Sequence, residues 1–451
     1  LRTSGAPIFI NKDVTDDDGG HKLTIETESA IILSGSSSWT GGTQINKGVL
    51  IFGGEDNTPG VTDGITIGSL GYAGIGVDNN VGAFLDEVDL VNSTGTIGFD
   101  SDPDSDSDPD TFTTDVDLTG ANASLRLGSA TEAILGDPDT FTGGKITPQG
   151  DDYRFGGGGG SLYVASLLED SEVPRNVVAD SPTDAPLTIW LLNPGNDFSG
   201  SVSATHSAVI FGQGVPLPLG TANFITNTGG YIGTANDMQS VSGFMSHFAV
   251  GTTGIIGFDI FPTATEAREI TDLDMSGFSS AYIGTASALR DEGGDVNGPG
   301  LELSGTIDPN SDDIHRFAAY KGGALEVSGT LTGNSMIIGT PDSIGTFGDP
   351  RHEEYSTVLI SGDNNGGLAG GTTLYSGRLL VGQGAGVAGI ADSSALGSGS
   401  LTVSPVSYIF GDDDEPPVPL LATDEAEITI PNNIVLNGEL NVGGDNDFTL
   451  S

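Results

Sequence analysis

The sequence predicts an all-β protein whose strands form a parallel β-helix, also called a β-solenoid. Three observations lead to this fold class. Glycine accounts for 71 of the 451 residues, apolar residues come in short β-branched runs, and long segments repeat along the chain. Short strands joined by tight turns explain the first two observations, and a repeat architecture explains the third.

The composition favours strands and turns over helices. Residues 31–33 (IIL) and 49–52 (VLIF) are typical of the apolar runs, and 22 prolines accompany the glycines. No long stretch has apolar residues spaced three and four apart, as an amphipathic helix requires. We therefore expect almost no helix. The recurring apolar runs also supply surface to bury, which a disordered chain lacks.

Internal repetition is the most informative feature of the chain. Residues 39–53 (WTGGTQINKGVLIFG) align without gaps on residues 198–212 (FSGSVSATHSAVIFG) and on residues 368–382 (LAGGTTLYSGRLLVG). Residues 94–100 (TGTIGFD) return in the same order as residues 253–259 (TGIIGFD). A unit of about 160 residues is thus present twice and begun a third time, which is the signature of a repeat array.

Each repeated unit is long enough to hold several turns of a solenoid. One coil of a β-solenoid takes roughly 20 to 30 residues. The predicted modules of one continuous, elongated solenoid are 1–160, 161–322 and a partial third module, 323–451. Within them, apolar and polar residues alternate before turn residues, as expected for strands with one face inward. Examples are residues 301–305 (LELSG), 325–329 (LEVSG), 401–404 (LTVS) and 440–444 (LNVGG).

Two of the positions that keep their residue type in all three copies are informative. The first position holds Trp39, Phe198 or Leu368, and the third holds Gly41, Gly200 or Gly370. We expect the large apolar residue to lie in the core. The glycine marks a place where a Cβ does not fit or where φ is positive.

The turns before the aligned segments differ between copies. Residues 193–197 precede the second segment and residues 362–367 precede the third. Variable turns usually project outward and tolerate insertion. If the protein has a specific ligand, we expect these turns to bind it.

Charge and cysteine content exclude several classes of function. The 14 Lys and Arg residues against 62 Asp and Glu residues give a net charge of −48, so nucleic acids and anionic membranes are unsuitable partners. A saline or calcium-containing exterior would screen this charge. The chain has no cysteine, which excludes disulfides and thiol chemistry. No apolar run is long enough to span a membrane, so we expect this segment not to be membrane-embedded.

One acidic run is a candidate calcium site. Its carboxylates occupy alternate positions: Asp100, Asp102, Asp104, Asp106, Asp108 and Asp110. Calcium prefers such oxygen ligands, although the run lacks the glycine and the closing glutamate of a helix-flanked calcium loop. A solvated loop is the alternative, because residues 260–265 (IFPTAT) replace the run in the second module. No other cofactor is expected.

No residue constellation predicts an enzyme. Arg154 and Arg316 occupy equivalent places in two modules, which favours a repeated structural bond, to Asp152 and Asp313, over a single active centre. The histidines have no metal-ligand spacing, and no nucleophile turn or phosphate loop is present. We therefore expect no catalytic activity.

Several of these residues together resemble a known family. Residues 32–35 (ILSG) with 39–53, and residues 359–362 (LISG) with 370–382 and then 395–403 (ALGSGSLTV), resemble the autotransporter-associated β-strand repeat, also called the passenger-associated transport repeat. The resemblance implies a right-handed parallel β-helix outside a Gram-negative-type cell, often within a very large surface protein. It carries over no catalytic residues.

The expected function is that of an extracellular structural element of a bacterial cell surface, such as a stalk, a filament or a coat unit. Its partners would be further copies of itself or adjoining modules of a larger chain. The first alternative is an adhesin that binds a surface glycan or protein through the variable turns. The second is a polysaccharide-degrading β-helix enzyme, which would need acidic side chains converging in a groove.

Overall fold

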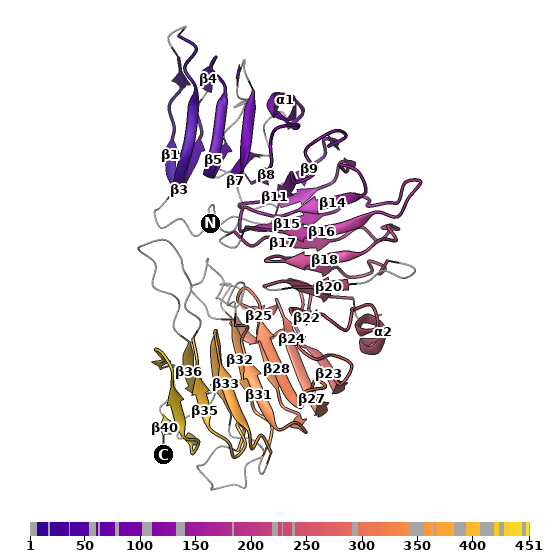
Figure 1. The fold of residues 1–451 in the computed structure, drawn as a ribbon, viewed down its shortest axis with the longest axis vertical. Coiled ribbons are helices and arrows are strands. Elements are labelled where there is room, and N and C mark those ends of the chain that lie inside the picture. The colour runs from indigo at the N-terminus through magenta and orange to yellow at the C-terminus, as the bar shows by residue number, and fades with distance from the viewer. Residues whose placement is uncertain are drawn as a thin grey trace. The chain divides into compact units, whose positions relative to one another are not determined.

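The computed structural model divides the chain into two compact units, residues 1–223 (unit 1) and 224–451 (unit 2) (Figure 1). It describes all residues except 1–6, 17–18, 36, 54–59, 62–63, 77–80, 102–110, 132–139, 183–184, 219–223, 228, 237–239, 291–295, 342–355, 365–366, 383–393, 406–418, 424–427, 444–447 and 451. Parallel strands dominate both units.

Two runs of hydrogen-bonded parallel strands build unit 1. Ladder 1 consists, in spatial order, of β1 (Ile8–Ile10), β3 (Leu23–Leu33), β5 (Thr43–Phe52), β7 (Ile65–Gly76), β8 (Thr96–Asp100), β11 (Arg126–Gly128), β14 (Asp152–Phe155), β16 (Asn176–Asp180) and β18 (Val202–Thr205). Ladder 2 consists of β9 (Thr111–Phe112), β12 (Thr140–Thr142), β15 (Ser161–Val164), β17 (Thr188–Leu191) and β19 (Ala208–Phe211). Smaller groups are β2 (Val14–Thr15), β4 (Ser37–Trp39) and β6 (Gly60–Val61), and β10 (Val116–Asp117) with β13 (Ile146–Thr147).

Unit 2 also has two ladders. Ladder 3 consists of β21 (Tyr231–Thr234), β22 (Ile255–Phe258), β24 (Tyr282–Thr285), β28 (Ile314–Ala319), β31 (Ser335–Ile338), β33 (Gly371–Leu374), β35 (Leu401–Val403) and β38 (Ile434–Leu436). Ladder 4 consists of β23 (Arg268–Asp274), β27 (Leu301–Asp308), β29 (Ala324–Val327), β32 (Thr357–Ile360), β34 (Arg378–Val381), β36 (Leu420–Thr423) and β39 (Asn441–Val442), with β30 (Thr330–Leu331) beside β27.

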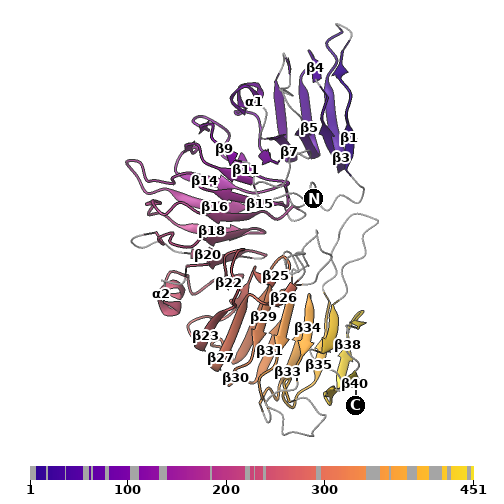
Figure 2. The ribbon, with the colours of Figure 1, turned by 180° about the vertical axis from the view of Figure 1, so that it is seen from behind.

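The other strands of unit 2 are short. They are β20 (Phe224–Thr226), the antiparallel pair β25 (Ala288–Arg290) and β26 (Val296–Pro299), and the parallel pair β37 (Ile428–Ile430) and β40 (Phe448–Leu450). The reverse view shows β26, β29 and β34 of unit 2 (Figure 2).

The chain alternates between the two ladders of a unit. From β14 to β19 in unit 1, each strand pairs with the strand two places further along the chain. From β31 to β36 in unit 2, the chain likewise alternates between ladders 3 and 4. Tyr153 pairs with Val177, which pairs with Val202, so one step along ladder 1 takes about 25 residues. The predicted all-β class with parallel strands is therefore confirmed.

Two short helices depart from the strand pattern. They are α1 (Val81–Glu87) and α2 (Val241–Met245), and each buries one phenylalanine completely, Phe84 and Phe244. They occupy equivalent places in the repeat, which the sequence reading missed because each segment is shorter than two helical turns. Neither helix is long or apolar enough to cross a membrane.

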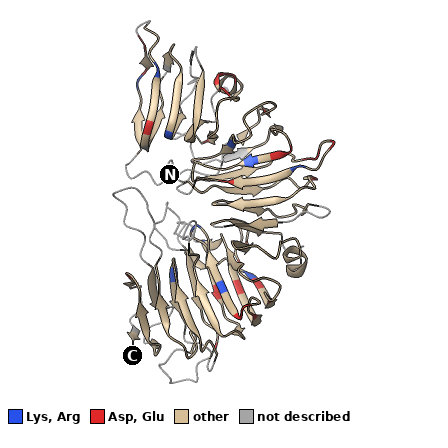
Figure 3. Ribbon diagram, in the orientation of Figure 1, with Lys and Arg blue, Asp and Glu red and all other residues tan. Residues whose placement is uncertain are grey.

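Side-chain burial follows two patterns. In β27, Leu301 and Leu303 are buried whereas Glu302 between them is half-exposed, as the alternation predicts. In β17 and β19 every residue is buried, which is typical of parallel strands covered on both faces. At residues 440–444 the predicted strand is present as Asn441–Val442, but its predicted inward face is wrong, because Val442 is 54% exposed. Most strand residues carry no charge (Figure 3).

The repeated core positions are confirmed. Trp39, Phe198 and Leu368 are all buried. The repeated glycines are needed because neighbouring atoms leave no room for a Cβ. A Cβ would overlap the carbonyl oxygen of Gly20 at Gly41, that of Arg175 at Gly200, and the hydroxyl of Ser335 at Gly370. Of the two explanations that the sequence allowed, close approach is correct, since none of these glycines has a positive φ.

Gly200→Ala should therefore destabilise unit 1. A methyl group forced against the Arg175 carbonyl should lower the free energy of unfolding by about 1–3 kcal/mol. The matched control is Gly143→Ala, because the nearest atom to a Cβ there lies at an ordinary 3.6 Å. Urea unfolding followed by tryptophan fluorescence suits the comparison, since both tryptophans, Trp39 and Trp190, lie in unit 1. Equal midpoints for the two variants would contradict the packing argument.

Candidate functional site

The predicted calcium run begins at a buried residue. Asp100 is the last residue of β8 and is fully buried. Asp102, Asp104, Asp106, Asp108 and Asp110 lie outside the residues that the structure describes. The calcium hypothesis therefore stays a prediction. Among the described residues, no group of three or more His, Cys, Asp or Glu side chains could hold a metal ion.

The Asp100 carboxylate takes part in a buried hydrogen-bonded group that we name the Tyr72 centre. Its members are Tyr72 on β7, Asp100 on β8 and Ala130 after β11. The Tyr72 hydroxyl donates to the Asp100 carboxylate at 2.7 Å. The Ala130 N–H donates to Asp100 Oδ1 at 2.7 Å and approaches the Tyr72 oxygen at 2.9 Å. Three successive strands of ladder 1 are thereby joined through side chains as well as through their backbones.

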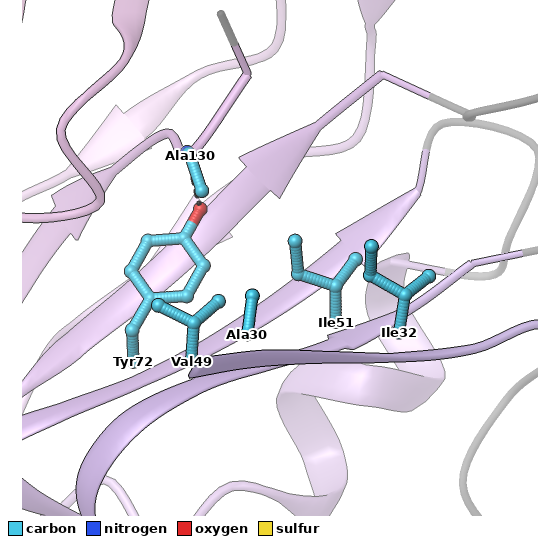
Figure 4. Close-up of a cluster of buried hydrophobic side chains, with 6 residues drawn as sticks. All are labelled: Ala30, Ile32, Val49, Ile51, Tyr72 and Ala130. Atoms are coloured by element: carbon cyan, nitrogen blue, oxygen red, sulfur yellow. Dashed lines mark hydrogen bonds between the residues drawn. The ribbon is translucent and has the colours of Figure 1, made fainter. Parts of the chain in front are cut away.

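Apolar side chains enclose the Tyr72 ring. The ring belongs to a cluster with Ala30, Val49 and Ile51 of the two preceding strands, and its hydroxyl is directed at Ala130 (Figure 4). Tyr72 is 2% exposed. The Tyr72 ring and the Asp100 side chain are therefore shielded from bulk solvent.

The second module contains the same arrangement, which we name the Tyr231 centre. Tyr231 on β21 donates to the carboxylate of Asp259 at 2.7 Å. The Ala286 N–H donates to Asp259 Oδ1 at 2.8 Å and approaches the Tyr231 oxygen at 3.1 Å. Hydroxyls of Thr285 and Ser287 donate to the same carboxylate oxygen at 3.2 and 3.0 Å. Asp259 is fully buried, as Asp100 is.

Glycines on the neighbouring strand make room for each tyrosine. Gly98 of β8 lies beneath the Tyr72 ring, and Gly257 of β22 lies beneath the Tyr231 ring. A Cβ at either glycine would overlap the tyrosine hydroxyl. The repeated Ile-Gly-Phe-Asp sequence of β8 and its copy thus has a physical reason. The glycine admits the ring, and the aspartate two residues later meets the hydroxyl.

Burial dominates the electrostatics of both centres. It raises the pKa of Asp100 to about 6, while hydrogen bonds from Tyr72 and the Ala130 N–H act in the opposite direction. Burial also raises the pKa of Asp259. The pKa of Tyr72 and that of Tyr231 are raised well above the ordinary value by burial and by the neighbouring carboxylate. In both centres the tyrosine keeps its proton and donates it in a hydrogen bond to the aspartate, which joins neighbouring strands.

The two repeated arginines form structural bonds, one of them with a different partner from the predicted one. Arg154 pairs with Asp152 at 2.9 Å, as predicted. Arg316 donates to both carboxylate oxygens of Asp312, at 2.9 and 2.6 Å, so the predicted pairing with Asp313 is wrong. The physical reason is local backbone geometry, since Asp313 has a positive φ of 66° and ends the turn that leads into β28.

His315 is a core residue rather than a metal ligand. It is 1% exposed and stacks on Phe317. Its Nε2 accepts a hydrogen bond from the Gly333 N–H at 2.9 Å. Burial lowers its pKa to about 4, so the ring is a neutral acceptor at physiological pH.

Buried asparagines tie the variable turns to neighbouring turns. Asn196 accepts a hydrogen bond from the Leu168 N–H at 2.9 Å. Asn364 accepts from the Leu331 N–H at 3.0 Å and donates to the Ala395 carbonyl at 2.7 Å. These two side chains therefore point inward, whereas Pro194, Gly195 and Asp197 of the first turn are exposed. In the part of the chain that the structure describes, the one exposed large aromatic residue is Phe9.

The sequence reading missed both tyrosine–aspartate centres, although a signal was present. Tyr72 and Tyr231 are separated by the same 159 residues as Asp100 and Asp259. Each aspartate is the last residue of an aligned segment, residues 94–100 or 253–259, whereas the tyrosines lie outside these segments.

No protein-family model, curated protein or solved structure matches the chain. Its resemblance to the autotransporter-associated repeat accordingly rests on the sequence motifs alone. Function has to be inferred from the ladders and from the two buried centres.

A double-mutant cycle on Tyr72→Phe and Asp100→Asn should show strong coupling. Tyr72→Phe removes the donor to a buried carboxylate and should lower the free energy of unfolding by about 1.5–3 kcal/mol. In the Asp100→Asn background the loss in the free energy of unfolding caused by Tyr72→Phe should be smaller by about 1 kcal/mol or more, because no buried charge is left unpaired. Urea unfolding at pH 7.5 or above measures all four corners of the cycle. Additive effects would show that the hydroxyl and the carboxylate do not support each other.

Proposed function

We propose that the chain is a segment of a right-handed parallel β-helix that serves as an extracellular structural element of a bacterial cell surface. The role would be that of a stalk, filament or coat unit. The observation that carries the proposal is the alternation of the chain between two parallel ladders, with each strand paired to the strand one coil away. A fold of this kind extends by stacking, so its length is its useful property.

Polar side chains of the outer faces also support a structural role. On ladder 4, each of three glutamates accepts a hydrogen bond from a serine that lies in, or directly after, the neighbouring strand. The pairs are Ser304 to Glu269 at 2.9 Å, Ser328 to Glu302 at 2.9 Å and Ser361 to Glu326 at 2.7 Å. Such groups join coils, whereas a glycosidase needs two carboxylates free to face a sugar. This distribution favours a scaffold over a catalytic groove.

Strands at the margins of the ladders support association with further strands. Ile8 and Phe9 of β1 are about half exposed, and so are Leu436 of β38 and Val442 of β39. An additional parallel strand would bury this apolar area and satisfy the backbone groups of the strand edge. Adjoining modules of a larger chain or further copies are therefore the proposed partners. The net charge of −48 suits a salt-containing exterior that screens repulsion between them.

Adhesion is the second candidate, and one observation favours it. Val91 and Val250 follow α1 and α2 at equivalent places in the repeat, and they are 65% and 70% exposed. Exposed apolar residues on a repeated turn are typical of contact surfaces when they form a patch. A glycan or protein of another surface would then be the ligand.

Electron microscopy and diffraction of the purified chain, with and without millimolar calcium, would test the structural role. Concentrated material should form regular assemblies with a reflection near ~4.8 Å along the assembly axis, the spacing of hydrogen-bonded strands. If the assemblies were lost in chelator, the result would indicate in addition that the acidic run binds calcium. Monomeric particles that bind a glycan saturably on an array, or that cleave a polysaccharide, would overturn the structural role in favour of adhesion or catalysis.

A further inference from the structure

We propose that the bond between Asn437 and Gly438 is a self-modification site, at which the asparagine loses ammonia and rearranges to isoaspartate, and that this change releases strand β39 from ladder 4. Asparagine followed by glycine favours the reaction, because glycine has no side chain to shield its peptide nitrogen. The inference goes beyond the proposed structural role and does not depend on it.

The sequence contains three Asn-Gly pairs, and their surroundings differ. They are Asn297 with Gly298, residues 365–366 (NG), and Asn437 with Gly438. Residues 365–366 lie outside the part of the chain that the structure describes. Asn297 and Asn437 are both exposed, so contact with water does not distinguish them. The pairing of the backbone does.

The groups that must react at Asn437 are not engaged elsewhere. Strand β38 ends at Leu436, and the chain bends at Asn437 and Gly438 (Figure 2). The Asn437 N–H donates to the Val403 carbonyl at 2.9 Å. Among the described residues, the Gly438 N–H has no acceptor and the Asn437 side chain makes no hydrogen bond. A short side chain of this kind reaches the backbone of the residues that follow it.

Asn297, by contrast, is held in a paired strand. It lies in β26, and Gly298 pairs with Leu289 of the antiparallel strand β25. An extended strand holds ψ near about +135°. The side-chain carbonyl reaches the following nitrogen only after rotation about ψ, and that rotation would break the pairing of the strand. Asn297 is therefore the matched slow site within the same chain.

The reaction needs water as its sole co-reactant. The Gly438 nitrogen gives its proton to solvent base and bonds to the side-chain carbonyl carbon of Asn437. The carbon–nitrogen bond of the side-chain amide breaks, its nitrogen takes a proton from solvent and leaves as ammonia, and a five-membered cyclic imide remains. Water then opens the ring. Cleavage at the side-chain carbonyl gives aspartate, whereas cleavage at the main-chain carbonyl gives isoaspartate, whose main chain is longer by one carbon.

Strand pairing on both sides of the site makes this extra carbon disruptive. Leu436 is fixed opposite Val403 on ladder 3, and Asn441 is fixed opposite Leu420 on ladder 4. Residues 437–440 alone connect the two paired positions, so few bonds can absorb the added length. One of the two strands must therefore shift.

Strand β39 is the one expected to shift. It has two residues, both exposed, whereas β38 pairs with β35 along three residues. The Asn441 N–H donates to the Pro419 carbonyl at 2.9 Å, and the Gly443 N–H donates to the Leu421 carbonyl at 3.1 Å. Loss of these two hydrogen bonds would expose both amides to hydrogen exchange.

The first experiment ages the full chain at pH 8.5 and 37 °C and measures isoaspartate by mass spectrometry with electron-transfer fragmentation. Cleavage after glutamate, under mildly acidic conditions that suppress new ring closure, places the two sites in separate peptides, residues 293–302 and 428–439. Isoaspartate should form at Asn437 at least about 5-fold faster than at Asn297, the ratio that opening one strand hydrogen bond implies. In concentrated urea the two rates should become equal, because glycine follows both asparagines. Equal rates in the folded chain, or the same ratio with and without urea, would overturn the proposal.

The second experiment measures hydrogen exchange at Asn441 and Gly443 in the isoaspartate fraction of the aged chain. Asn437→Gln is the unreactive control, since its longer side chain would have to close a less favourable six-membered ring. Freshly purified Asn437→Asp adds the negative charge without lengthening the main chain. Both amides should exchange at least about 5-fold faster in the isoaspartate fraction than in either variant. The same exchange rate in that fraction and in Asn437→Asp would contradict the release of β39.

Discussion

The hydrogen bond between parallel strands that are distant in the chain is the interaction on which the rest of the structure depends. Tyr153, Val177 and Val202 lie on three neighbouring strands, yet about 25 residues separate each from the next along the chain. These strands are therefore held by contacts that are distant in sequence. Once the register of one strand is fixed, the inward side chains of the next strand have fixed neighbours.

Side-chain hydrogen bonds between neighbouring strands and turns reinforce that register at a few places. The Tyr72 and Tyr231 centres each join three successive strands, and Asn364 joins its own turn to the turns on both sides. These groups are polar and buried, so a shift of one residue in register would leave them unpaired at a large cost. They exclude wrong registers more strongly than apolar contacts do, since leucine and valine tolerate small shifts.

Local patterns allowed much of the fold to be predicted, and the missing parts depended on contacts between strands that are distant in sequence. Alternation over residues 301–305 predicted an inward-facing strand, whereas the glycine at position 200 left a close approach and a positive φ equally open. The partner of Arg316 was wrong by one residue because the left-handed backbone at Asp313 cannot be read from composition. The Tyr72 centre was missed because its three members come from strands whose pairing the sequence does not state.

The position of the buried centres has a consequence for how such chains lengthen in evolution. Each centre is contained within one copy of the repeat, from the tyrosine to the N–H that closes it 58 residues later in unit 1 and 55 in unit 2. A tandem duplication of about 160 residues therefore carries its own control of register and needs no matching change elsewhere. Genes that encode such modules can grow by copying, and the outer turns of each copy can then diverge independently.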